Sequence, residues 1–362
     1  MTSRERVLAA VEHRTPDRVP ITFDAEPEVI ERLMDHFGVG TREEVWDALH
    51  VDTRLVGADH HDPRVREENG IRYDFWGIGE KQQAYSGGTY WEYCVHPLAG
   101  MSTVDEVENY NWPSPEEVAF DTIRETRRRN PDKAVIAHIT HGGFFKATHL
   151  RGLQAFMMDL GMAPDLAEAI IRRVMAYFLP ALERLCSEAG DSFDIFYVAD
   201  DFCTAQGPMI SPAMFRDLIQ PYLAAIADTV HAHGKKMLLH TCGSIRALLP
   251  DIIAAGVDVM EPIQTSAEGM DVEGLKRDFG ETMAFYGSID LIRVLSRGTP
   301  AEVREEVMKN FRVLGRNGGL IIGPGHTYIQ PDTTLENILA LYETAWRECV
   351  YDDSAKVLSN TE

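Results

Sequence analysis

The sequence lacks several features that define large classes of protein. It contains only five cysteines, widely scattered and never in a Cys-x-x-Cys arrangement, which argues against a disulfide framework. Its longest apolar runs fall far short of the ~20 residues that a membrane-spanning helix needs. No Gly-x-Gly-x-x-Gly or Walker pattern follows an expected strand, so we do not expect a nucleotide-binding protein.

Positive charge is also scarce. Lys and Arg total 35 against 57 Asp and Glu, which gives a formal net charge of −22. Such a charge opposes binding to nucleic acid and to acidic membranes, and a polyanionic ligand would need a local basic pocket. The N-terminus leads into an amphipathic helix and not into a secretory signal, so we expect a cytoplasmic protein.

Helical segments alternate regularly with short, nearly continuous apolar runs, which are typical of parallel strands buried on both faces. Crossover helices are expected between many of them, for example at 164–189, 211–233, 244–255 and 300–315. The pattern predicts an α/β fold, a single (β/α)8 TIM barrel with an N-terminal helical extension. The eight expected strands are 19–24, 51–56, 134–139, 193–199, 236–240, 257–261, 283–286 and 319–322.

Residues from about 60 to 111 interrupt this alternation with aromatic and β-branched runs around Gly87 and Gly88. We interpret this segment as an inserted antiparallel flap, which either covers one end of the barrel or serves as a lid or partner surface. The barrel with its flap is expected to span residues 1–355, and residues 356–362 are expected to form a frayed tail.

Polar side chains collect at the expected carboxyl ends of the strands, where (β/α)8 enzymes build their active sites. Four of them, at the ends of different strands, are candidates for lining a substrate pocket: Asp24, His141, Gln206 and Tyr286.

His240 and Cys242 are the most informative pair. In an extended chain, residues i and i+2 project from the same face, so this imidazole and this thiolate can bind one ion, most naturally zinc. A third ligand must come from another strand. His326, within a Gly-Pro-Gly-His turn, is our choice, and Glu261 is the fallback. The alternative is a buried histidine beside a buried free cysteine, with His326 bonding substrate and Glu261 facing a helix N-terminus.

Two adjacent carboxylates, Asp200 and Asp201, follow the fourth expected strand. Adjacent residues in an extended chain point in opposite directions, so we expect only Asp201 to face the cavity, although both could cap a turn. Asp201 and Glu261 are candidates for orienting substrate or moving a proton. Cys242 precedes an expected helix at 244, whose amides would lower the pKa of the thiol.

Several segments together resemble the uroporphyrinogen decarboxylase superfamily, and within it the zinc-dependent corrinoid methyltransferases. They span nearly the whole chain and are Arg14-Thr-Pro-Asp-Arg-Val-Pro20, Asp200-Asp-Phe-Cys-Thr-Ala-Gln206, Ile210-Ser-Pro212, His240-Thr-Cys-Gly243 and Gly325-His-Thr-Tyr-Ile-Gln-Pro-Asp332. The resemblance implies a (β/α)8 barrel.

Two departures distinguish the branches of that family. Decarboxylases carry an arginine-rich segment at the end of the first strand, where this chain has Ile21-Thr-Phe-Asp-Ala-Glu26. Acidic residues there would repel a polycarboxylate substrate. In the best-known methyltransferases the third zinc ligand is a cysteine, whereas the matching position here is His326, and Gly-His is also what the decarboxylases carry. One thiolate in place of two would make a bound zinc more electrophilic.

The resemblance therefore implies a zinc-dependent methyltransferase that moves a methyl group between a corrinoid and a small thiol, a folate, or a methylated donor such as an ether or amine. No corrinoid-carrier domain is recognisable in the chain, so a separate carrier protein is expected as partner. The alternatives are a metal-independent lyase of the decarboxylase type and a non-catalytic protein that binds zinc or a corrinoid.

Overall fold

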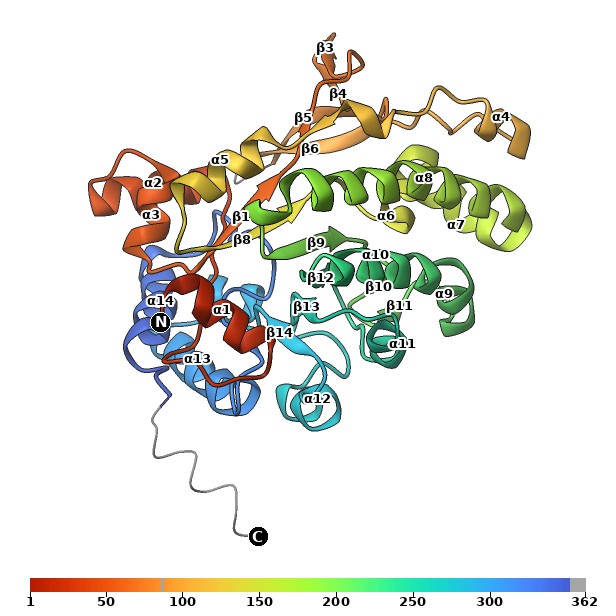
Figure 1. Ribbon diagram of the computed structural model, residues 1–362. Helices are drawn as coiled ribbons and strands as arrows, with labels where there is room; N and C mark the ends of the chain where they lie inside the picture. The colour runs from red at the N-terminus through yellow and green to blue at the C-terminus, as the bar shows by residue number, and fades with distance from the viewer. Residues whose placement is uncertain (86–87, 352–362) are drawn as a thin grey trace.

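A computed structural model describes residues 1–85 and 88–351, and the expected frayed tail at 356–362 lies outside these residues. A curled parallel sheet forms the centre of the molecule, with helices packed around it (Figure 1). All its pairings are parallel, as the near-continuous apolar runs predicted. Its seven strands, in spatial order, are β1 (Thr53–Gly57), β8 (Ala134–His138), β9 (Ile195–Ala199), β12 (Lys236–His240), β13 (Val259–Glu261), β14 (Ala284–Tyr286) and β15 (Leu320–Ile321).

Seven of the eight predicted strands are therefore present, in an arrangement consistent with a TIM barrel. The segment predicted as the first strand, 19–24, makes a single isolated bridge, from Ile21 to Ile322, with backbone hydrogen bonds from Thr22 N to Ile322 O and from Ile322 N to Pro20 O. On the side of β1, Ile21 O accepts from Asp52 N, but the N–H of Ile21 is bonded to the Asp52 carboxylate at 2.8 Å, and Pro20 has no N–H to donate. The segment therefore lies where the eighth strand is expected but does not form a regular ladder.

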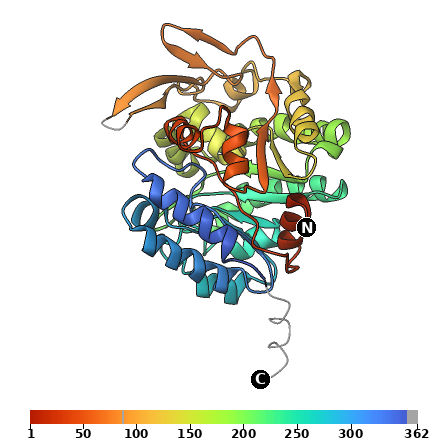
Figure 2. The ribbon, with the colours of Figure 1, turned by 90° about the vertical axis from the view of Figure 1, so that its left-hand side faces the viewer.

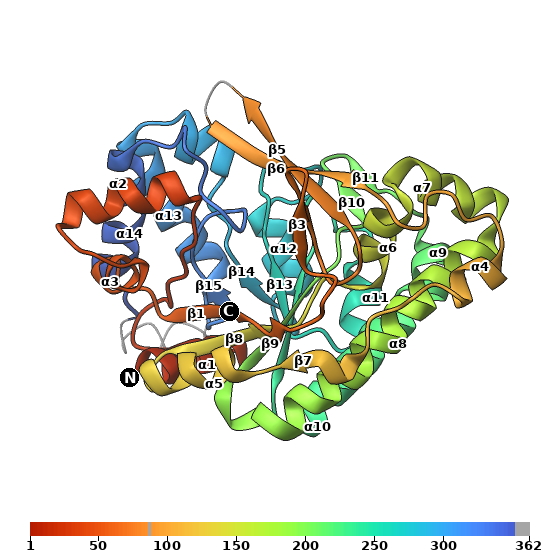
Figure 3. The same ribbon diagram turned by 90° about the horizontal axis from the view of Figure 1, so that it is seen from above.

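Most of the helices lie between successive strands and cover the outside of the sheet (Figures 1 and 3). Several begin at capping boxes, such as Thr2 with Glu5 and Thr299 with Glu302. In chain order the helices are α1 (Ser3–Val11), α2 (Pro27–Phe37), α3 (Arg42–Ala48), α4 (Val104–Glu108), α5 (Asp121–Arg129), α6 (Gly143–Arg151), α7 (Leu153–Met162), α8 (Pro164–Ala189), α9 (Pro212–Leu218), α10 (Gln220–Ala232), α11 (Leu249–Ala254), α12 (Val272–Phe279), α13 (Pro300–Leu314) and α14 (Leu335–Arg347).

Helix α1 packs against the amino ends of the strands. Its Val7 and Val11 belong to a buried apolar cluster that includes the first residues of four strands, and α1 contacts β1, β8 and β15. The helix therefore fills this end of the sheet. The sheet residues of the cluster are Ala134, Ile136, Ile195, Leu238, Val259, Ala284 and Ile321.

Within residues 60–111, a separate antiparallel sheet projects from the body (Figure 2). Its strands pair in the order β3 (Arg66–Glu68), β4 (Ile71–Tyr73), β5 (Gly79–Tyr85) and β6 (Gly88–Val95). Tyr93 of β6 stacks on His149 of α6 with 3.8 Å between ring centroids, which anchors the base of this sheet beside the central one. Its use as a cover or partner surface stays a prediction.

None of the helices in the described ranges 1–85 and 88–351 has the length and apolar character that a membrane crossing requires.

Candidate active site

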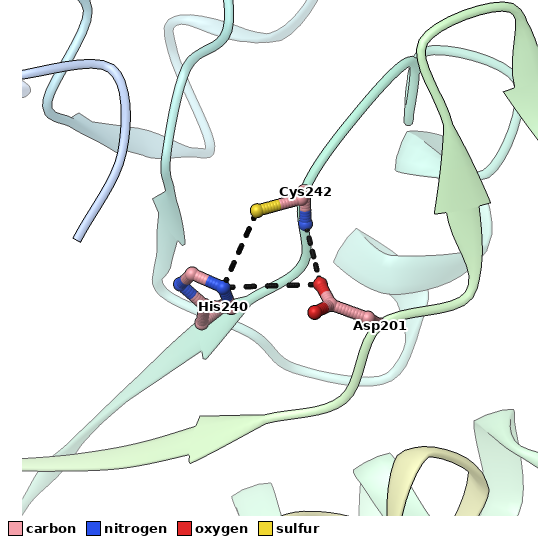
Figure 4. Close-up of side chains that lie close together, drawn as sticks. All are labelled: Asp201, His240 and Cys242. Carbon is pink, nitrogen blue, oxygen red and sulfur yellow. Dashed lines mark hydrogen bonds and ion pairs between the residues drawn. The ribbon is translucent and has the colours of Figure 1, made fainter. Parts of the chain in front are cut away.

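His240 and Cys242 lie at the carboxyl end of β12 and face each other (Figure 4). The Sγ atom of Cys242 is 3.6 Å from Nε2 of His240, and the His240 side chain is almost fully buried. Burial alone would lower the pKa of His240, but Glu261 and Cys242 outweigh it and hold that pKa well above its usual range. Burial raises the pKa of the Cys242 thiol, and hydrogen bonds with His240 and His326 reverse this and lower it.

The thiolate is therefore stabilised by imidazoles and not by a helix. The helix expected at 244 is α11 and begins only at Leu249, so its amides are not in place to act on the sulfur as predicted. Gly243, with φ of +96°, turns the chain directly after Cys242.

Glu261, the last residue of β13, is bonded to the other ring nitrogen of His240, Nδ1. Thr327 Oγ1 lies 3.3 Å from the same Nδ1 and 3.4 Å from Glu261 Oε1. Glu261 thus sits on the side of the ring opposite to Cys242. The carboxylate fixes the ring so that Nε2 points towards the sulfur.

The adjacent carboxylates Asp200 and Asp201 diverge. Asp201 Oδ1 accepts a hydrogen bond from Cys242 N at 2.7 Å and lies 3.8 Å from His240 Nε2 (Figure 4). Asp200 turns away and accepts from Phe144 N and Phe145 N at the start of α6. Burial raises the pKa of Asp200 to about 7. Only Asp201 therefore reaches the pair.

His326 approaches Cys242 from the β15 side. A hydrogen bond with the Cys242 sulfur raises the pKa of His326, while Tyr328 N donates to its Nδ1 at 3.3 Å. Cys242 therefore has an imidazole partner on two sides.

The donor set suits a zinc ion. The ligand atoms of Asp201, His240 and Cys242 all lie within 4.8 Å of one another, and His326, whose pKa the Cys242 sulfur raises, lies beside this group but is not part of it. In a tetrahedral site with Zn–S of ~2.3 Å and Zn–N of ~2.0 Å, sulfur and nitrogen ligands lie roughly 3.5 Å apart. The observed 3.6 Å between Cys242 Sγ and His240 Nε2 agrees with that spacing. A carboxylate on the far ring nitrogen is the usual support for a metal-binding histidine.

These residues line a cavity of about 540 Å³ at the carboxyl ends of the strands. His141 lines it too, whereas Asp24 and Tyr286 line a smaller adjoining cavity of about 30 Å³, together with Glu261 and His326. Gln206 is exposed on the β10–β11 hairpin, between Cys203–Thr204 and Gly207–Pro208. Its Oε1 accepts from Thr204, and it lines neither cavity, which corrects its predicted place in the pocket.

Sequence reasoning missed three groups in the larger cavity. His138 ends β8, Lys146 lies on α6, and His60 is stacked on Phe75 with 3.9 Å between ring centroids. For Lys146 the available signal was its place directly after two phenylalanines, in Gly143-Phe-Phe-Lys-Ala147, because a lysine among apolar residues is rarely buried without a partner.

The chain as a whole is similar to several known proteins. The uroporphyrinogen decarboxylase (URO-D) family profile matches residues 94–347. The methylcobamide:CoM methyltransferase MtaA of Methanosarcina barkeri is 25% identical over 356 residues, covering 94% of this chain and 96% of that one. A methylated-thiol–coenzyme M methyltransferase of Methanosarcina mazei is 27% identical over 270 residues, covering 71% of this chain and 67% of that one.

Among solved structures, a methyltransferase from Methanosarcina mazei superimposes with a TM-score of 0.64 at 20% identity, covering 95% of this chain and 98% of that one, which supports the fold. The relatives named above are methyltransferases, and the chain belongs to the uroporphyrinogen decarboxylase family.

Proposed function

We propose that this protein is a zinc-dependent methyltransferase that moves a methyl group from a corrinoid, carried by a partner protein, to a small thiol. The observation that carries the proposal is the pair His240 and Cys242, held 3.6 Å apart with Glu261 on the far ring nitrogen. Relatives named for methylcobamide and for coenzyme M support the corrinoid and the thiol.

We propose that His240 Nε2, Cys242 Sγ and His326 would hold the zinc. His326 helps to lower the pKa of the Cys242 thiol, so its imidazole lies near the sulfur that would bind the ion. Asp201 Oδ1 is engaged by the backbone N–H of Cys242, which positions the carboxylate without requiring it as a ligand.

When bound, zinc would supply a Lewis acid that favours the deprotonated thiol near neutral pH. Asp201 is the carboxylate in reach to take the thiol proton, while Glu261 and Thr327 hold the His240 ring. The acceptor sulfur then forms a bond to the methyl carbon of the corrinoid. The carbon–cobalt bond breaks, and its electron pair stays on cobalt, which goes from Co(III) to Co(I).

A decarboxylase activity fits the cavity less well. The larger cavity is lined by no arginine in the described part of the chain, whereas a porphyrinogen with several carboxylates needs such groups. Asp24 and Glu26 stand near the first strand segment instead. Like charges there would oppose a polycarboxylate.

The test is zinc analysis of the wild-type protein beside His240→Ala, Cys242→Ala, His326→Ala and Asp201→Asn, with methylcobalamin demethylation by a thiol followed spectroscopically. We expect one zinc per chain in wild type, lost in the first three variants. Asp201→Asn should keep zinc and lose turnover.

Loss of zinc in Asp201→Asn together with its retention in His326→Ala would replace His326 by Asp201 as the third ligand. Wild-type protein without zinc that decarboxylates porphyrinogens would identify a metal-independent lyase. Tight corrinoid or zinc binding without any methyl transfer would identify a non-catalytic binding protein, and either result ends the proposal.

A further inference from the structure

The wall of the large cavity that α6 forms carries a buried lysine, Lys146. Burial lowers the pKa of this lysine, and the neighbouring carboxylate of Asp74 partly offsets that shift by favouring the ammonium form. Lys146 is 4% exposed, lines the cavity, and has a single ion-pair partner, Asp74, at 3.5 Å between Nζ and Oδ2. A lysine ammonium has three N–H donors. At least two donors of Lys146 therefore have no acceptor among residues 1–85 and 88–351.

Two imidazoles face the same cavity without hydrogen-bond partners in these described ranges. His138 ends strand β8 and His141 follows in the turn that leads to α6. The His138 ring packs near Gly57 and Tyr197, and the His141 ring lies near Phe145 and His149. Polar atoms in so enclosed a place normally have a partner, so these nitrogens are available to a ligand.

Both rings are neutral at physiological pH. Burial lowers the pKa of His138 to about 4 and that of His141 well below its usual range. A neutral imidazole offers one N–H donor. The cavity wall thus combines one ammonium with two imidazole donors.

Asp74 limits this positive charge. Its Oδ1 accepts from Trp76 N and Ile78 N, while Oδ2 faces Lys146. Burial raises the pKa of Asp74, so its ionised form is disfavoured there. An anion arriving at Lys146 would compete with Asp74 for the ammonium.

We propose that Lys146, His138 and His141 form an anion subsite of the active cavity, which binds the carboxylate or sulfonate of a small thiol whose sulfur reaches His240 and Cys242. This proposal rests on the proposed methyl transfer only for the position of the reacting sulfur. The overall charge of −22 makes this cluster significant, because an anion finds few other favourable places on the protein.

The test compares acidic and neutral thiols of matched length: 2-mercaptoethanesulfonate with 2-mercaptoethanol, and 3-mercaptopropionate with 3-mercaptopropanol. KM for each is measured with methylcobalamin in zinc-loaded wild type, Lys146→Met and Asp74→Asn. We expect Lys146→Met to raise KM for the acidic thiols about tenfold or more, as loss of a charge-assisted hydrogen bond implies. KM for the neutral thiols should stay within about twofold.

Asp74→Asn is the decisive variant, because its expected change in KM for the acidic thiols is opposite to that of Lys146→Met. It keeps the Oδ1 acceptor for the two backbone amides but removes the competing charge, so KM for the acidic thiols should fall severalfold. A purely structural Lys146–Asp74 pair predicts that both substitutions impair the enzyme alike for every thiol. Opposite shifts that are confined to the acidic thiols support the subsite, and parallel shifts overturn it.

Lys133→Met is the matched control. Lys133 immediately precedes β8, at the end opposite His138, and its Nζ donates to Val51 O at 2.7 Å. It should leave the preference for acidic thiols unchanged. His141→Phe provides a second test of the subsite, with an expected rise in KM for the acidic thiols only.

Calorimetric titration of the same proteins with the two acidic thiols separates the subsite from the methyl transfer. Binding that weakens in Lys146→Met and strengthens in Asp74→Asn, without methyl transfer in wild type, would retain the subsite and reject the proposed function. Methyl transfer with the same thiol preference in all variants would retain the proposed function and reject the subsite.

Discussion

The carboxylate of Glu261 is hydrogen-bonded to Nδ1 of His240, and this contact decides which ring nitrogen faces Cys242. Glu261 comes from β13 and His240 from the neighbouring β12, at paired positions of the parallel ladder. The orientation of the ring is therefore built into the register of the two strands. We therefore propose Glu261 as a positioning residue, in place of its alternative prediction as the third zinc ligand.

Glu261→Gln should weaken zinc binding about 10- to 100-fold, because loss of a supporting carboxylate typically has that effect on a metal-binding histidine. The amide can still accept from Nδ1, so the fold should persist. Competition with a chromophoric chelator measures the affinity. Glu268→Gln, at an exposed position of the following loop, is the control. Unchanged zinc affinity in Glu261→Gln would remove the orienting role.

Gly243→Ala should displace Cys242 and reduce zinc content. Gly243 has φ of +96°, and a Cβ atom there would lie 2.4 Å from Thr204 O, which is backbone and cannot move aside easily. Gly234→Ala is matched in backbone strain, with φ of +68°, but its Cβ would have no atom within 4 Å. Zinc per chain and turnover should fall in the first variant and persist in the second. Equal losses would point to backbone strain alone.

His149→Phe should make the protein less sensitive to acid. His149 is 8% exposed, its Nδ1 is buried without a partner among residues 1–85 and 88–351, and burial lowers its pKa to about 3. The unfolded chain, with a pKa near 6.5, takes up the proton first as the pH falls. The stability that the neutral ring contributes is thus present above pH ~6.5 and lost below it.

At pH 5, His149 is expected to lower the free energy of unfolding by about 2 kcal/mol, because pH 5 lies about 1.5 units below the pKa of ~6.5 in the unfolded chain. The free energy of unfolding in urea, at pH 8 and pH 5, should therefore decrease less in His149→Phe than in wild type by about that amount. Any packing cost of the phenyl ring applies at both pH values and cancels. His36→Phe, at an exposed position of α2, is the control.

Asp52→Asn should destabilise the protein by roughly 3–5 kcal/mol, the usual cost of breaking a buried ion pair. Asp52 is fully buried and bonds Arg6 Nη1, Arg18 Nη1 and Ile21 N, each at 2.8 Å. Urea unfolding measures the change. Glu125→Gln, which loses exposed pairs with Arg128 and Arg129, should remain close to wild type. A small effect of Asp52→Asn would show that solvent reaches these arginines.

The sequence predicted the elements that depend on local pattern. Apolar runs predicted seven of the parallel strands, and the alternation of side chains predicted that only one of the adjacent carboxylates, Asp201, faces the cavity, where the structure places it beside Cys242. It did not predict that Pro20 and the Asp52 carboxylate would prevent a regular strand at 19–24, because that contact joins residues 31 positions apart.

From the sequence, only those site residues could be predicted that lie at the ends of recognisable strands. His240 and Cys242 share one strand, so their proximity follows from extended geometry, whereas the contact of Glu261 with Nδ1 depends on the register between two strands. Lys146 lies on a helix, so the rule that active-site residues follow strands could not find it. Gln206 follows a strand, but its hairpin carries it to the surface.

The position of helix α1 bears on the order in which ligands bind to the large cavity. Because Val7 and Val11 fill the amino end of the sheet, the large cavity opens at the carboxyl end. In the proposed methyl transfer, the small thiol and the bulky methyl carrier would share this route. The thiol would then bind before the carrier docks, and the methylated product would leave after the carrier has dissociated.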